Sequence, residues 1–142
     1  MTTPLLSLQV EKKPSELGRV QDRVEAFWRE QGLPDDRKFE VLVSIEEVLT
    51  NIFRHGGTKD PADTEIEMRA SVSGGEIEIQ MMDNGPAFDP LAHPAPKIDA
   101  PLEERRPGGL GIHLVRQLMD RVHYERKSDR NWLTMAKRFA IP

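Results

Sequence analysis

The stretch Ser44–Gly56, S-I-E-E-V-L-T-N-I-F-R-H-G, decides how the rest of the sequence is interpreted. Its apolar residues recur at helical spacing, which predicts a helix that packs one face against a core. Glu47 and Asn51 are one turn apart on the other face, so a carboxylate and a carboxamide project side by side. Such a pair is most often part of a solvated helix surface, but it also suits the wall of an active site.

Composition limits the class of protein. The chain of 142 residues has the length of one domain, and we expect a single domain over residues 1–142. Its formal net charge of -4 argues against nucleic acid as a partner, because binding phosphates needs a basic surface. It has no cysteine, which fits a reducing cytoplasm. No apolar run approaches the roughly 20 residues that span a bilayer, so we expect a cytoplasmic protein without membrane contact.

Hydrophobic periodicity predicts the elements that precede the central helix. Alternating apolar residues predict a strand at 6–10. Helical spacing then predicts a helix that ends at Gly32, with Ser15 as its N-cap. The central helix is expected to open at Pro34, whose fixed φ suits a first helical turn, and to end at Gly56.

The second half of the chain reads as strands around one more helix. Two alternating runs, 66–72 and 77–81, are joined through Gly74 and Gly75, which predicts an antiparallel hairpin with one buried face. This order of elements predicts an α+β two-layer sandwich, in which helices cover one face of a mainly antiparallel mixed sheet. The remaining predicted segments are a helix at 112–119, strands at 122–124 and 132–135, and a turn at 128–131.

The window from Pro86 to Pro107 has neither helical nor strand periodicity. Six of the chain's 11 prolines lie in it. A long irregular connection inside a compact domain is uncommon and tends to be a lid or a binding loop. A merely tolerated insertion is the alternative.

Two glycine-containing motifs flank this window. Asp83-x-Gly85 follows a strand, where the carboxylate can accept a hydrogen bond from an exocyclic amine while Gly85 lets a flat ring approach the backbone. Gly109-x-Gly111 opens a helix, whose exposed N–H groups and positive dipole end suit phosphates. Each motif is weak by itself, but their order along the chain is specific.

The polar pair of the central helix suits the same chemistry. The carbonyl oxygen of Asn51 is a hard ligand that Mg²⁺ accepts alongside phosphate oxygens. Glu47 can orient or deprotonate an attacking hydroxyl group. Arg105 and Arg106 at the end of the irregular window could reach a phosphate or an acidic partner, and Arg54 has a similar choice. Solvated surface arginines are the alternative at all three positions.

These motifs, E-x-x-x-N at 47–51, D-x-G at 83–85 and G-x-G at 109–111, resemble those of the Bergerat-fold ATPase superfamily of gyrase, Hsp90, histidine kinases and MutL. Within it the sequence is most similar to stand-alone anti-sigma-factor serine kinases, and the similarity covers nearly the whole chain. The resemblance implies a histidine kinase-like ATPase domain that binds ATP and Mg²⁺ between its helices and its sheet. The irregular window, about 86–107, would be the ATP lid.

The resemblance also implies a role for individual residues. Glu47 would be the catalytic base, Asn51 the Mg²⁺ ligand and Asp83 the residue that binds the adenine amine. Two departures from the family pattern stand out: Ala87 replaces the second glycine of D-x-G-x-G, and no Gly-Thr pair occurs near the last strand, where Thr134 is a possible substitute. The expected nucleotide-binding residues are Asn51, Arg54, Asp83, Gly85, Ala87, Arg105, Gly108, Gly109, Leu110, Gly111, Ile112 and Thr134.

The implied function is that of an ATP-dependent protein serine/threonine kinase. Members of the family phosphorylate a serine on a STAS-type anti-anti-sigma protein and sequester a sigma factor as homodimers. Two other functions remain open from the residues. The chain could be a non-catalytic module that binds ATP or only a partner, as Ala87 and the missing Gly-Thr pair would favour. It could also be the detached catalytic half of a phosphorelay that phosphorylates histidine.

Overall fold

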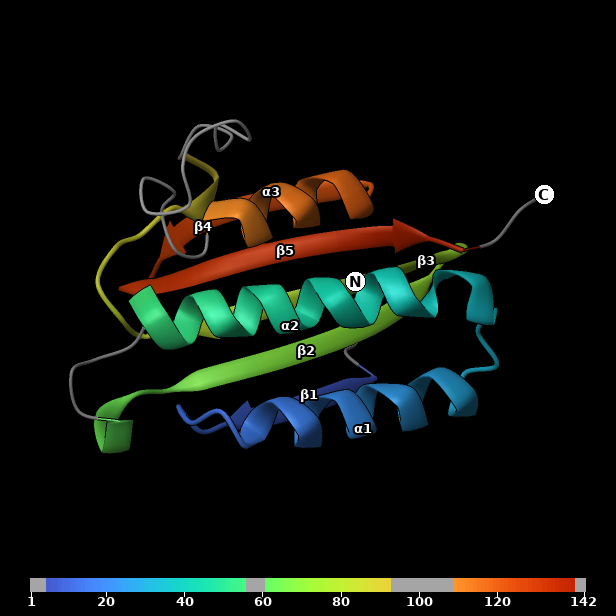
Figure 1. Cartoon of the computed structure of the whole chain (residues 1–142), viewed down its shortest axis with the longest axis horizontal. Helices are drawn as coiled ribbons and strands as arrows, with labels where there is room; N and C mark the ends of the chain where they lie inside the picture. The colour runs from blue at the N-terminus through green and yellow to red at the C-terminus, as the bar shows by residue number, and fades with distance from the viewer. Residues whose placement is uncertain (1–4, 56–60, 93–108, 140–142) are drawn as a thin grey trace.

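A five-stranded sheet and three helices form the two layers of the molecule (Figure 1). The computed structural model describes residues 5–55, 61–92 and 109–139. Short 3-10 turns occur at Asp35–Arg37, Pro61–Asp63 and Pro90–Ala92. The regular elements are β1 (Leu6–Val10), α1 (Glu16–Glu30), α2 (Lys38–His55), β2 (Ile66–Ser73), β3 (Glu76–Asp83), α3 (Gly109–Leu118), β4 (Arg121–Lys127) and β5 (Arg130–Arg138).

The sheet has the strand order β1-β2-β3-β5-β4, and α1, α2 and α3 all cover the same face of it (Figure 1). This confirms the predicted α+β two-layer sandwich. The expected mixed sheet is wrong for the described strands, because all four neighbouring pairs are antiparallel. The reason is visible in the path of the chain: α1 leads away from the end of β1, and α2 returns to that end before β2 begins (Figure 1).

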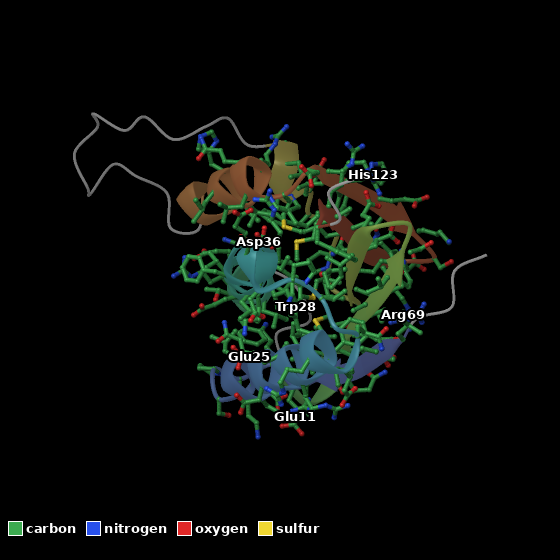
Figure 2. The ribbon with its side chains drawn as sticks, turned by 90° about the vertical axis from the view of Figure 1, so that its right-hand side faces the viewer. Glu11, Glu25, Trp28, Asp36, Arg69 and His123 are labelled. Carbon is green, nitrogen blue, oxygen red and sulfur yellow. The ribbon has the colours of Figure 1, made fainter. Side chains whose placement is uncertain are left out.

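The core lies between the two layers. Alternate residues of β2 and β3 point toward the helices and are buried, as the period-2 pattern predicted. Trp28 of α1 is only 1% exposed, lies in the interior (Figure 2), and donates its indole N–H to the Pro34 carbonyl oxygen at 3.0 Å. The apolar residues that meet across the layers include Val20, Val24, Val41, Ile45, Leu49, Ile66, Met68, Ile77, Ile79, Met81 and Met135.

The hairpins turn through two residues each. Gly74 and Gly75 have φ of 58° and 76°, and Ser128 and Asp129 have φ of 56° and 59°. The second turn is shorter than the predicted 128–131, so Asn131 belongs to strand β5. This correction places Asn131 in the sheet, which matters for the site.

The starts of the first two helices compare differently with the prediction. Ser15 occupies the predicted N-cap position of α1, but its backbone is helical and its side chain makes no capping hydrogen bond. The central helix begins at Lys38 after a 3-10 turn at Asp35–Arg37 rather than at Pro34. Of the helices that the structure describes, none combines the length and the apolar character that crossing a membrane requires.

Candidate functional site

A pocket opens between α2 and the sheet, beside the end of β3. Its cavity volume is about 20 Å³, inside about 360 Å³ of non-protein space that includes open solvent. It collects two of the residues expected to bind nucleotide, Asn51 and Asp83, from elements far apart in the sequence. The complete lining is Val48, Asn51, Ile52, Met81, Asp83, Phe88, Pro90, Tyr124, Asn131 and Leu133.

Asp83 is the buried carboxylate of this pocket. It ends β3, is 5% exposed, and its Oδ1 accepts hydrogen bonds from the Gly85 N–H at 2.9 Å and the Asn131 Nδ2 at 3.0 Å. A buried carboxylate held by two donors has little freedom to rotate. The D-x-G motif therefore forms a tight turn in which Gly85 keeps the Asp83 side chain oriented.

Asn131 is a site residue that the sequence analysis missed. It is 5% exposed and lies directly opposite Asp83 in the β3–β5 pair. Besides donating to Asp83, its Nδ2 donates to the Pro86 carbonyl oxygen at 2.9 Å. Its Oδ1 accepts from the Tyr124 hydroxyl at 2.5 Å and from the Phe88 N–H at 3.3 Å. One carboxamide thus ties the acid, the start of the expected lid and strand β4 together.

Arg126 completes this network from β4. Its Nη1 donates to the Gly85 carbonyl oxygen at 2.7 Å and to Asn131 Oδ1 at 3.3 Å.

The sequence contained a signal that could have identified Asn131. If only residues 128–129 had been assigned to the turn, Asn131 would have been predicted to lie in the last strand, on the same face as Leu133.

Thr134 does not reach the pocket. Its partners across the sheet are Gln80 and His123, and cross-strand partners share one face of a sheet. Figure 2 shows His123 on the side of the sheet away from the helices. Because side chains alternate along β5, Thr134 lies on the face opposite to that of Asn131. The suggestion that Thr134 substitutes for the missing Gly-Thr pair is therefore wrong, and Asn131 occupies the position beside the acid.

Asn51 and Glu47 lie on the side of α2 that faces the site. Asn51 is 8% exposed and lines the pocket, while Glu47, one turn earlier, is half-buried. The carboxylate of Glu47 lies against Gly111 in the first turns of α3. Glu47 thus lies against α3, and Asn51 lies in the wall of the pocket. The expected acid–amide pair is therefore not a solvated helix surface.

The other expected residues are distributed around this centre. Ile112 is buried at 6%, whereas Arg54 and Ala87 are exposed. The backbone of Gly109 and Leu110 forms the start of α3. Arg105, Arg106, Gly108 and the lid from residue 93 onward lie outside the described residues.

The described part of the expected lid contributes to the lining of the pocket. Phe88 and Pro90 line it, and the Phe88 ring stacks on His55 at the end of α2 with 4.8 Å between ring centroids. Over residues 5–55, 61–92 and 109–139, no group of three or more acidic or histidine side chains could hold a metal ion.

Comparisons with known proteins agree with this geometry. The model of the histidine kinase-like ATPase domain family matches residues 10–137. Serine/threonine-protein kinase BtrW of Bordetella bronchiseptica is 30% identical over 120 residues, which are 80% of this chain and 83% of that protein. Serine-protein kinase RsbW of Bacillus licheniformis is 26% identical over 119 residues, 80% of this chain and 73% of the relative.

Solved structures show the same fold. The RsbU and RsbW domains of a Mycobacterium tuberculosis protein superpose with a TM-score of 0.70 at 16% identity, over 99% of this chain and 34% of that one. The histidine kinase domain of a blue-light activated kinase from Erythrobacter litoralis gives 0.54 at 18% identity, over 97% of this chain and 64% of that one.

The names of the sequence relatives bear out the expectation of an ATP-dependent protein serine/threonine kinase. The family match rests on the chain between β1 and the end of β5, which contains the whole pocket. On these grounds, the chain belongs to the histidine kinase-like ATPase family, in the branch of the anti-sigma-factor serine kinases.

Proposed function

We propose that this protein transfers the γ-phosphate of ATP to a serine of a STAS-type anti-anti-sigma protein and also sequesters a sigma factor. The observation that carries the proposal is the meeting of three distant motifs. Asp83 and Asn51 line one pocket, and Glu47, one turn from Asn51 on α2, lies against Gly111 of α3. The names of the kinase relatives support the same reaction class.

Asp83 and its partners would select adenine. The carboxylate would accept a hydrogen bond from the exocyclic amine of adenine, and the lack of a side chain at Gly85 would suit the approach of a flat ring. Guanine presents a carbonyl oxygen at that position, so two acceptors would face each other without a proton between them. The hydrogen bonds from Asn131 and Gly85 hold the acid in place, so its orientation is set before the base enters.

The triphosphate would extend from this pocket toward α3. Asn51 is the residue that would hold Mg²⁺, and the N–H groups at the glycine-rich start of α3 would meet the phosphates. When bound, Mg²⁺ neutralises charge on the phosphates, which is the main requirement of phosphoryl transfer. The buried carboxamide of Asn51 fits this arrangement.

Glu47 would act on the serine hydroxyl of the partner. In the transfer, the serine oxygen forms a bond to the γ-phosphorus, the bond from that phosphorus to the leaving ADP oxygen breaks, and the hydroxyl proton passes to the Glu47 carboxylate. Correct positioning of the hydroxyl contributes as much as basicity to such a step. The half-buried position of Glu47, one turn from Asn51, suits this role.

A phosphotransfer assay tests the proposal. The protein is mixed with γ-labelled ATP, Mg²⁺ and a STAS-type protein from the same organism. We expect label on a serine of the STAS-type protein, lost when that serine is changed to alanine and lost with Glu47→Ala. Acid-labile label on histidine would favour the phosphorelay instead. ATP binding without transfer to any STAS-type protein tried would favour the non-catalytic module.

Quaternary structure and location belong to the same proposal. The family resemblance implies a homodimer in the cytoplasm. Light scattering of the purified protein, alone and with a sigma factor, measures both the dimer and the complex. A monomer that binds no sigma factor would remove the sequestering part of the proposal but leave the kinase reaction intact.

A further inference from the structure

The side chain of Glu47 lies so close to Gly111 that it leaves no space for a Cβ atom there. The position of Gly111 in the helix does not by itself require glycine. It is the third residue of α3, and it is not among the described glycines that have positive φ. Glycine inside a helix is less favourable than alanine, because it has more conformational freedom to lose. The local backbone therefore gives no reason for glycine at this position, and a contact must be sought instead.

The contact is with the carboxylate of α2. A Cβ atom built on Gly111 would lie closer than 3.0 Å to Glu47 Oε2 and 3.1 Å from its Cδ, and real Cβ atoms essentially never approach a neighbour within 3.0 Å. The next atom is Glu47 Cβ at 3.7 Å, so all three nearest atoms belong to this one side chain. The carboxylate thus occupies the volume that any other residue at 111 would fill.

Gly18 offers the matched comparison. It also lies inside a helix, α1, but a Cβ built there meets nothing within 4 Å. Adding a methyl group at Gly18 changes only helix propensity, whereas adding it at Gly111 must move something. The atom in its way is the far end of a flexible side chain, so Glu47 would swing aside while the backbone of α3 stayed in place.

We propose that Gly111 is a positioning residue for Glu47: the absence of its side chain holds open the place that the carboxylate takes beside the start of α3. The catalytic consequence of this positioning rests on the proposed role of Glu47, but the positioning itself does not.

The direct test observes Glu47 without nucleotide. In protein labelled with ¹³C at glutamate carboxyl carbons, the resonance that disappears in Glu47→Gln identifies Glu47. We expect this resonance to shift in Gly111→Ala and to stay unchanged in Gly18→Ala. An unchanged resonance in Gly111→Ala would overturn the proposal, whether or not the protein is a kinase.

The functional test is a double-mutant cycle. We expect Gly111→Ala to lower kcat at least tenfold while the Kd for ATP stays within about twofold of wild type, and to have no further effect on kcat in a Glu47→Ala background. A comparable loss in both backgrounds, or a loss of ATP affinity that persists without Glu47, would show that Gly111 acts on the phosphates and would overturn the proposal. If wild type transfers no phosphate, the proposed reaction fails, and the resonance still decides the positioning.

Discussion

The two ends of the site are held in different ways. At the end of β3, Asp83 is fixed by hydrogen bonds from Gly85 and Asn131, and Asn131 is in turn fixed by Tyr124. At the start of α3, the Glu47 carboxylate lies in the space that a side chain at Gly111 would fill. A network of directed bonds suits recognition of a base, and a carboxylate placed by packing suits a group that must meet a second protein. Substitutions at the first end should therefore change binding, and those at the second should change turnover.

The largest effect is expected from Glu47→Ala. A positioned acid–base group contributes about 10²–10⁴-fold to the rate, so phosphotransfer should fall by that factor while ATP binding persists. Single-turnover transfer and ATP titration measure the two quantities separately. Glu46→Ala is the matched control, because the neighbouring Glu46 is exposed and accepts a hydrogen bond from Gln21 at 3.3 Å. Equal turnover in Glu47→Ala and Glu46→Ala would remove the proposed base.

Asp83→Asn should act on binding instead. The Oδ1 of asparagine can keep both hydrogen bonds that Asp83 accepts, which turns its NH₂ group toward the amine of adenine. A donor facing a donor costs about 1–3 kcal/mol, or roughly 5- to 150-fold in the Kd for ATP. The melting temperature without nucleotide should change little. A large loss of stability with unchanged Kd would mean that Asp83 is structural.

Asn131→Ala should weaken the fold near the pocket. It leaves the buried Asp83 without one donor and the Tyr124 hydroxyl without its acceptor. We expect the free energy of unfolding to fall by about 1–3 kcal/mol, measured by urea denaturation. Tyr124→Phe removes only one bond of the network and should cost about 1 kcal/mol. If both variants were as stable as wild type, the network would have no energetic role.

The smallest effect is expected at Thr134. It lies on the face of the sheet away from the pocket, beside His123. Thr134→Ala should leave the Kd for ATP within about twofold of wild type, as is usual for substitutions away from a site. A tenfold weaker Kd would show that the last strand contributes to the site through Thr134 rather than Asn131.

Local patterns were sufficient to predict the fold. Alternation in β2 and β3 and helical spacing in α1 and α2 depend on which residues must face a core, and the structure confirms these elements. The start of α2 was misplaced because Pro34 suits both a helix and a 3-10 turn. The parallel component expected of the sheet does not occur among the described strands, because each of them runs antiparallel to its neighbours.

The site was harder to predict because its residues meet across the fold. Ser44 lies on the polar side of α2 yet is fully buried, and α2 packs against α3. Hydrophobic periodicity cannot reveal that a second helix covers a polar face. The sequence prediction assigned Asn131 to a four-residue turn. The actual turn has only two residues, Ser128 and Asp129, and both adopt left-handed conformations that are uncommon for residues other than glycine, so the sequence did not indicate so short a turn. Its partnership with Asp83 depends on the register of β3 and β5.

The most direct test of the account is calorimetric titration of the purified protein with ATP and with GTP, in Mg²⁺, beside Asp83→Asn. The account predicts saturable binding of ATP, much weaker binding of GTP, and loss of most of the ATP affinity in the variant. No heat of binding at millimolar ATP, or equal affinity of wild type and Asp83→Asn, would contradict the nucleotide site described between α2 and β3.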